Sequence, residues 1–184
     1  MTYRVGVLVG SLRKDSFNRQ LARAVQKLAP PELSFHDVRI DDLPLYNQDD
    51  DANPHPNVKR LKSEIVASQA LLFATPEYNR SIPGVLKNAI DHAARPWGQS
   101  VWAPRPAGVI GISVGAPGTS MAQQHLRNVL ACLDVPVMGL PEVFLQISEG
   151  MFDADGFAKA DLEPFMQGWM DRYVAWVKKL AVAR

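Results

Sequence analysis

YRVGVLVGSLRKDSFN, residues 3–18, is the stretch that decides the fold. Residues 3–9 are a short β-branched run that ends at Gly10, and such a run predicts a buried strand. Ser16 stands where a helix N-cap belongs, and apolar residues at helical spacing follow it as far as Leu28. A strand, a short polar loop and a helix in this order are the first half of a βαβ unit, which implies a parallel sheet.

The same alternation continues along the chain. Further strands are predicted at residues 33–38, 70–74, 107–114 and 143–147, and further helices at 58–68, 85–93, 126–133 and 162–180. Strands that alternate with helices predict an α/β fold: one doubly wound, five-stranded parallel sheet with helices on both faces and the common order 2-1-3-4-5. The strand at 33–38 alternates apolar and polar residues, so we expect it at an edge of the sheet.

Composition limits the range of functions. The chain has 184 residues, so we expect residues 1–184 to form one domain. Its formal net charge of +1 speaks against a nucleic-acid partner, for which a basic excess is typical. No apolar stretch approaches the length of a membrane span, and the chain carries no signal-peptide pattern, so we expect a cytoplasmic protein. The lone Cys132 cannot form an intramolecular disulfide, and we expect it to be a buried packing residue of its helix. We expect no metal site.

One long segment, residues 39–57, fits none of the predicted elements. It contains three prolines and the acidic run Asp49–Asp51. A structureless segment of this length in a compact domain is usually either functional or disordered.

The predicted topology says where a ligand should bind. In a doubly wound sheet, ligands bind outside the carboxyl ends of the strands, at the point where the strand order reverses. With the order 2-1-3-4-5, that point lies between the first and third strands. Three segments are therefore of interest: the first loop (residues 10–18), the second loop (75–84) and the third loop (113–120).

The first loop has the chemistry of an anion site. It offers the hydroxyls of Ser11 and Ser16, the guanidinium of Arg13, the amide of Asn18 and the free N–H groups of a helix start. Such donors suit phosphate oxygens. An ordinary serine cap beside solvated basic side chains explains the same residues, and the spacing alone leaves both readings open. The loop lacks the G-x-x-x-x-G-K-[ST] and G-x-G-x-x-G patterns of nucleotide-triphosphate and dinucleotide sites.

The second and third loops are suited to a flat ring. In the second loop, prolines stiffen the backbone, and Tyr78 beside Asn79 can flank a planar heterocycle. In the third loop, Gly115 and Gly118 allow the backbone to approach a ligand closely. The alternatives are a rigid surface turn and a helix start that is capped by the residues at 119–120. One anion-binding loop and two ring-binding loops fit a mononucleotide, and FMN has one terminal phosphate and one large planar ring.

Three stretches carry a family resemblance: GSLRKDSFN (10–18), DLPLYNQDDD (42–51) and TPEYNRSIPGVLKNAID (75–91). They resemble the NADPH-dependent FMN reductase family, and within it the bacterial NAD(P)H:quinone and chromate reductases. The resemblance covers nearly the whole chain in the same order. It implies a flavodoxin-like three-layer sandwich, tightly bound FMN, NADPH or NADH as co-substrate, and a homodimer or homotetramer with FMN near the subunit contacts.

The resemblance also implies a set of cofactor-binding residues. The first loop would hold the FMN phosphate, the second would border the isoalloxazine ring, and the third would meet the ring and the ribityl chain. In this order the residues are Ser11, Leu12, Arg13, Ser16, Phe17 and Asn18; Pro76, Glu77, Tyr78 and Asn79; Ser113 and Gly115. No catalytic side chain is expected, because the hydride chemistry belongs to the flavin.

Two positions depart from the family pattern. His92 stands where relatives often have Trp, and GTSMA at Gly118–Ala122 stands where relatives often have G-G-x-R-A. We expect both positions to lie at subunit contacts or at the rim of the ring site.

The function implied is an FMN-dependent NAD(P)H oxidoreductase. It would transfer a hydride through FMN to quinones or to other small oxidants (azo compounds, chromate or free flavin) by a ping-pong mechanism. An alternative is a flavodoxin-type electron carrier without NAD(P)H activity of its own, although such carriers are typically acidic and this chain is not. A flavin-free regulatory domain is a third possibility, which the colour of the purified protein would decide. A hydrolase is disfavoured because no G-x-S-x-G motif occurs.

Overall fold

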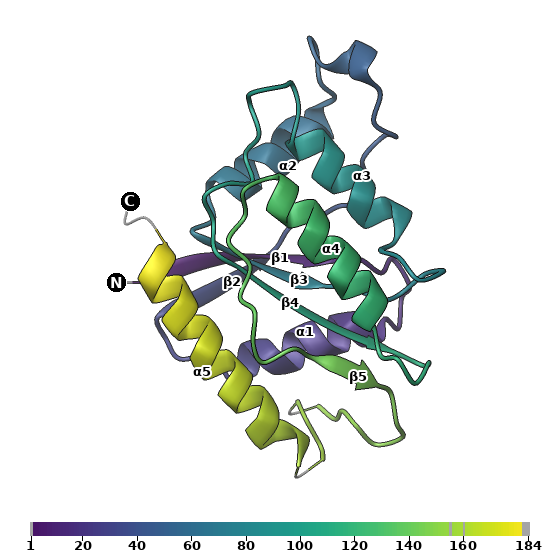
Figure 1. The fold of residues 1–184 in the computed structure, drawn as a ribbon, viewed down its shortest axis with the longest axis vertical. Helices are drawn as coiled ribbons and strands as arrows, with labels where there is room; N and C mark the ends of the chain where they lie inside the picture. The colour runs from purple at the N-terminus through teal and green to yellow at the C-terminus, as the bar shows by residue number, and fades with distance from the viewer. Residues whose placement is uncertain (1, 155, 160, 182–184) are drawn as a thin grey trace.

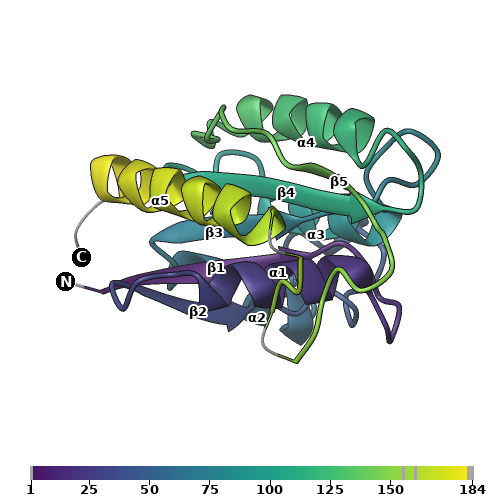
Figure 2. The same cartoon turned by 90° about the horizontal axis from the view of Figure 1, so that it is seen from below.

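The computed structural model describes residues 2–154, 156–159 and 161–181. They form a parallel sheet in the order β2-β1-β3-β4-β5 (Figure 1). The strands are β1 (Tyr3–Val9), β2 (Leu33–Asp37), β3 (Ala70–Ala74), β4 (Ala107–Ser113) and β5 (Phe144–Gln146). Figure 2 shows them side by side in this order. The predicted sheet, its strand order and the edge position of β2 are confirmed.

The helices form the two outer layers of the molecule. They are α1 (Phe17–Lys27), α2 (Pro56–Val66), α3 (Gly84–Ala93), α4 (Ser120–Cys132) and α5 (Leu162–Leu180). Helices α1 and α5 cover one face of the sheet, and α2, α3 and α4 cover the other (Figure 1). Each face has its own cluster of buried apolar side chains. The flavodoxin-like three-layer arrangement is therefore confirmed. No helix in the described ranges is long and apolar enough to span a bilayer.

Helix α5 packs along the sheet as a core element. Met166, Trp169, Tyr173 and Val177 recur at helical spacing and are fully buried. The ring of Trp169 stacks on that of Tyr173, with 5.2 Å between centroids, and the Tyr173 hydroxyl donates a hydrogen bond of 2.8 Å to the carbonyl of Leu71 in β3. The buried phenol therefore has a partner, and the helix is fixed in register against the central strands.

Three neighbouring strands end at the same edge of the sheet. Val9 of β1 is paired with Ala74 of β3, and Ala74 is paired with Ile110 of β4. The N–H of Gly10 donates to the carbonyl of Ala74 at 2.9 Å, and the N–H of Thr75 donates to the carbonyl of Ile110 at 3.0 Å. The first, second and third loops therefore start beside one another.

Residues 39–57 are ordered, and helix α3 holds them in place. The side chain of Asn88 accepts a hydrogen bond from Tyr46 N and donates one to the carbonyl of Pro44, both at 2.8 Å. His92 lies 2.9 Å from the same carbonyl through Nε2, and its ring meets the Tyr46 ring edge-on. A short 3₁₀ helix, η1 (Gln48–Asp50), lies within the segment. His92 is thus buried beneath this segment, where its ring nitrogen has a polar partner.

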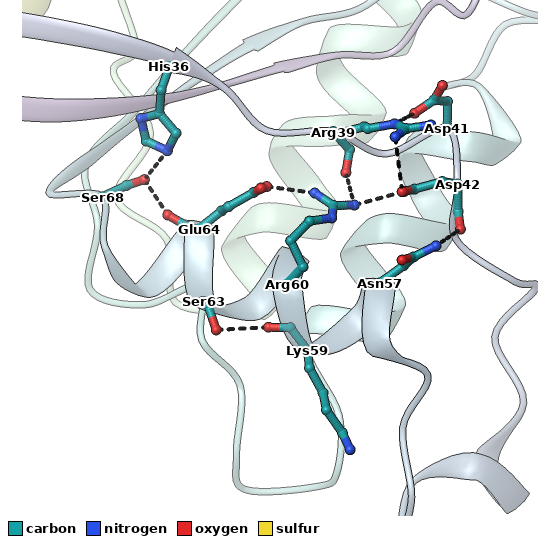
Figure 3. A network of polar contacts seen from close by, with 10 residues as sticks. All are labelled: His36, Arg39, Asp41, Asp42, Asn57, Lys59, Arg60, Ser63, Glu64 and Ser68. Atoms are coloured by element: carbon teal, nitrogen blue, oxygen red, sulfur yellow. Dashed lines mark hydrogen bonds and ion pairs between the residues drawn. The ribbon is translucent and has the colours of Figure 1, made fainter.

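A second set of polar contacts ties β2 and the start of this segment to α2 (Figure 3). The guanidinium of Arg60 bonds to Asp42 at 2.7 Å and to Glu64 at 2.8 Å. The backbone carbonyl of Glu64 accepts from the Ser68 hydroxyl, which lies 3.4 Å from Nε2 of His36 in β2. These contacts place the side chain of His36, a residue of β2, beside the segment that follows the C-terminal end of α2.

One packing prediction is wrong. Cys132 is exposed, not buried. The buried side of α4 carries Ala122, Leu126 and Leu130 at a spacing of four residues. Cys132 comes two residues after Leu130, and positions two apart on a helix do not face the same way.

A glycine of β4 is expected to be important for stability. A Cβ atom at Gly111 would lie 2.0 Å from Oγ1 of Thr119 and 2.5 Å from the backbone carbonyl of Thr75. Because backbone cannot easily give way, we expect Gly111→Ala to lower the free energy of unfolding by about 1–3 kcal/mol or more. Urea denaturation measures this.

Gly168 in the exposed part of α5 provides the matched control. Apart from its chain neighbours and the backbone of its own helix, no described atom lies within 4 Å of a Cβ at that position, so Gly168→Ala should stabilise the protein by about 0.5–1 kcal/mol. If Gly111→Ala is as stable as the wild type, the inference that Thr119 and Thr75 leave no room for a side chain at Gly111 is wrong.

The contact between His36 and Arg4 predicts a pH dependence of stability. Burial, and then the neighbouring Arg4 guanidinium, lower the pKa of His36 below its ordinary value. At a pH near these two pKa values, the unfolded state therefore binds more protons at His36 than the folded state does. The contribution of His36 to the free energy of unfolding is fully present above about pH 6.5. It is lost as the pH falls from the ordinary pKa of histidine toward the lower pKa in the folded protein.

We expect His36→Asn, which keeps an acceptor for Arg4, to reduce the decline of the unfolding free energy below about pH 6.5. Urea unfolding at a series of pH values measures it. Ser34→Asn introduces the same side chain two residues earlier in β2 and should keep the wild-type decline. Equal pH dependence of the wild type and His36→Asn would contradict the assignment.

Candidate functional site

The candidate site lies along the carboxyl edge of β1, β3 and β4, where the three loops meet. A Cβ at Gly10 in the first loop would lie 3.3 Å from the ring of Pro76 in the second loop. The second loop is in turn bonded to the start of α4, which the third loop leads into. The structure thus brings together the three loops that the topology singled out.

The first loop presents the positive end of helix α1. The Ser16 hydroxyl accepts a hydrogen bond of 3.3 Å from Arg19 N, which confirms the predicted N-cap. The N–H groups of Phe17 and Asn18 precede the first intrahelical bonds, and no acidic residue occupies the first turn. The Arg13 guanidinium lies 4.5 Å from the centre of the Phe17 ring. Free N–H groups, a helix dipole and a cation next to them favour an anion here.

The side chain of Asn18 has a different partner. Its carboxamide donates to the carbonyl of Ile112 at 2.9 Å and accepts from Ile112 N at 3.1 Å, and the residue is 3% exposed. Ile112 lies two residues beyond Ile110, the last residue of β4 that is paired with β3. The carboxamide therefore continues the β3 ladder after β3 has ended. The N–H of Asn18 is the part of this residue that remains for a ligand.

The second loop carries a tight hairpin at residues 78–81. Tyr78 N donates to the carbonyl of Ser81 at 2.9 Å, and Ser81 N donates to that of Tyr78 at 3.0 Å. The two central residues have positive φ angles, 51° at Asn79 and 67° at Arg80, as a type I′ turn requires. The hairpin holds the Tyr78 side chain at the surface.

The carboxylate of Glu77 caps helix α4. Its Oε2 accepts hydrogen bonds of 3.1 Å from both Met121 N and Ala122 N. Thr119 occupies the cap position but makes no capping bond with its side chain. The local cap at 119–120 that was considered from the sequence is therefore wrong, because a residue of another loop supplies the acceptor.

The third loop closes on itself. The Ser113 hydroxyl reaches the carbonyls of Gly118 and, at 3.3 Å, Gly115. Gly118 has a φ of +64°, and a Cβ there would lie 2.6 Å from the backbone of Phe144. Only glycine fits this turn. A Cβ at Gly115 would meet nothing closer than 3.6 Å, so the chain itself leaves space beside this residue.

One contact of the site has no counterpart in the sequence analysis. Oγ of Ser81 lies 2.7 Å from Nδ1 of His125 in α4. The two residues are 44 positions apart, and no local pattern pairs them. Only the packing of α4 against the second loop reveals the contact.

A cavity of about 330 Å³ lies beside the first loop, toward the end of β2. Its lining includes Arg19 and Arg39, but also Asp37 and Asp41. Arg39 is already bonded to Asp41 at 2.6 Å. The two guanidinium groups are balanced by two carboxylates, so this cavity does not favour a phosphate as the helix start does.

The fit of FMN can be tested on these loops. An anionic end matches the start of α1 with Arg13. A flat apolar body matches exposed apolar side chains of the second and third loops: Tyr78 and Val114 are 51% and 72% exposed. The space beside Gly115 allows a close approach of backbone to a ring. The residues present therefore fit a ligand with one phosphate and one planar ring, which is the form of FMN.

Comparison with known proteins agrees with this geometry. The pattern of the family described as NADPH-dependent FMN reductase matches residues 3–150. A 2-hydroxy-1,4-benzoquinone reductase from Burkholderia sp. is 50% identical over 179 residues, which are 97% of this chain and 98% of the relative. A quinone reductase from Pseudomonas putida is 48% identical over 177 residues, which are 96% of this chain and 95% of the relative.

Solved structures give the same result. A flavoenzyme NAD(P)H:(acceptor) oxidoreductase from Paracoccus denitrificans superposes with a TM-score of 0.94 and 44% identity, covering 98% of this chain and 100% of the other. A flavodoxin variant from Pseudomonas aeruginosa, 22% identical with a TM-score of 0.61 and coverage of 95% and 99%, shares the fold. The chain belongs to the NADPH-dependent FMN reductase family and is an NAD(P)H-dependent flavoenzyme that uses FMN.

Proposed function

We propose that this enzyme reduces quinones at the expense of NADPH or NADH, with FMN held by the three loops. The balanced reaction is NAD(P)H + H⁺ + quinone → NAD(P)⁺ + hydroquinone. Bound FMN supplies the hydride chemistry, which no side chain of the site needs to provide. The names of relatives at 50% and 48% identity support quinone as the oxidant. Chromate, azo compounds and free flavin are further candidate oxidants, because an exposed flavin suits each of them.

One observation carries the proposal. The start of α1 has free N–H groups and no acidic residue in its first turn, and exposed apolar side chains lie in the loops beside it. The phosphate would bind to the N–H groups of Phe17 and Asn18 and to Arg13, with Ser11 and Leu12 close by and Ser16 as the cap. The ring would lie against the second and third loops, where Pro76, Glu77, Tyr78, Asn79, Ser113 and Gly115 are found. In this assignment several polar side chains support the loops, while backbone N–H groups, the Arg13 guanidinium and exposed apolar side chains bind the cofactor.

We also propose that NAD(P)H and the oxidant use the site in turn, in a ping-pong cycle. Residues 1–184 would act as one FMN-binding domain. A homodimer or homotetramer is part of the same proposal. Its support is a set of apolar side chains outside the three loops that are strongly exposed in the single chain, Leu45, Trp97 and Leu140, at 69–88%.

A direct experiment tests the proposal. The purified protein, incubated with FMN and dialysed, should be yellow and should oxidise NADPH or NADH when 1,4-benzoquinone is present and no other reductase is added. Parallel reciprocal plots at varied NAD(P)H and quinone are expected for the ping-pong cycle. A yellow protein that does not oxidise NAD(P)H would instead be an electron carrier, and a colourless protein that takes up no FMN would overturn the proposal.

The phosphate assignment makes a separate prediction. Arg13→Ala should weaken FMN binding about tenfold or more, because charge-assisted hydrogen bonds contribute roughly 1.5–3 kcal/mol. Quenching of FMN fluorescence on titration with apoprotein measures the dissociation constant. Lys14→Ala removes the same charge from the next residue and should change this constant less than twofold. If both variants bind FMN equally well, Arg13 does not anchor the phosphate.

A further inference from the structure

We propose that His125 is a positioning residue for the oxidant. Through Ser81 it fixes the hairpin of residues 78–81, and so it sets how Tyr78 is presented at the site. The proposal rests on the function proposed above. There Tyr78 is assigned to the ring of FMN, and the oxidant binds at the same site in turn with NAD(P)H. His125 itself touches the hairpin and not the substrate.

The hairpin needs support from outside itself. Two consecutive residues that are not glycine, Asn79 and Arg80, have positive φ angles of 51° and 67°. This region of φ is unfavourable for residues with a Cβ, although Asn tolerates it better than most. The hairpin closes with one isolated pair of backbone bonds between Tyr78 and Ser81, outside the main sheet. Strain of this kind persists only where neighbouring structure over-determines the conformation.

Helix α4 supplies the support at both ends of the hairpin. Glu77, the residue before it, accepts from the N–H groups of Met121 and Ala122. Ser81, the last residue of the hairpin, lies 2.7 Å from His125, one turn further along the helix. The two contacts therefore join the hairpin to the first two turns of α4, one to backbone N–H groups at its start and one to a side chain about one turn later.

The bond between Ser81 and His125 does not depend on one protonation state. A neutral Nδ1 accepts from the serine hydroxyl, and a protonated Nδ1 donates to it. What matters is a polar atom at the Nδ1 position. Asparagine places its Oδ1 near that position, so His125→Asn should preserve the contact, whereas His125→Ala and Ser81→Ala should each remove it.

The first test uses the protein without FMN and without turnover. Hydrogen–deuterium exchange of the peptide that contains the Tyr78 and Ser81 amides should be at least fivefold faster in His125→Ala and in Ser81→Ala. The double variant should match the single variants, because all three lack the same bond. His125→Asn should stay within twofold of the wild type.

The second test uses the FMN-loaded enzyme. We expect His125→Ala and Ser81→Ala to raise the KM for 1,4-benzoquinone five- to tenfold while kcat changes less than twofold, and His125→Asn to restore the KM. A merely structural role would lower the yield of active enzyme and leave the KM unchanged. Asn128→Ala, at an exposed position of α4 about one turn beyond His125, is the matched control and should behave as the wild type.

The outcomes separate this proposal from the proposed function. If the wild type binds no FMN, the proposed function fails and the role toward the oxidant fails with it, while the exchange data still report whether the support exists. If the wild type is active and His125→Ala keeps both the exchange rate and the KM, the positioning role is wrong. Should His125→Ala fold poorly, Ser81→Ala removes the same bond with the smaller change.

Discussion

Strand β3 ends before its neighbour β4, and the two hydrogen bonds between Asn18 and Ile112 take the place of the strand pairing that is missing there. Strand β4 continues past the last residue that β3 can pair with, and its unpaired peptide groups would otherwise be buried without partners, which costs free energy. The carboxamide of Asn18 mimics a peptide group and fills this gap. Because Asn18 is the second residue of α1, the same bonds set where that helix begins. The position of the candidate phosphate site therefore depends on a contact with β4, which lies two strands away from β1 in the sheet.

A common principle connects the three loops: one polar side chain holds each loop, and other groups of the loop are left for the ligand. Asn18 bonds to β4, Glu77 caps α4, and Ser113 closes its own loop. Each of these side chains has the chemistry to bind FMN, and each already has a partner within the chain. Among the described residues, the groups that stay available include the N–H groups at the start of α1, the Arg13 guanidinium and the exposed faces of the apolar residues.

The fold could be predicted from local information because its elements are short and strongly patterned. The short apolar run at 70–74 favours a buried strand, the stripe of α5 has the spacing of a helix, and Ser16 marks the start of α1. The roles of Glu77, Ser81 and His125 could not be predicted, because each depends on a partner more than forty positions away. Cys132 was misassigned since apolar composition does not say which side of a helix a residue occupies. The sequence likewise could not show that residues 39–57 have a defined structure, because this structure depends on Asn88 and His92 of the later helix α3.

The bonds of Asn18 also bear on the thermodynamics of ligand binding. They join the start of α1 to the residue just before the third loop, so the proposed phosphate end and the proposed ring end of the site are connected through one buried side chain. Two loops that are already fixed relative to each other lose little conformational entropy when a ligand bridges them. Much of the conformational entropy of the two loops is then lost when the chain folds, and not when the cofactor binds. The contact between the Asn18 side chain and Ile112 would thus raise the affinity for a ligand that spans both loops, although this contact lies within the protein itself.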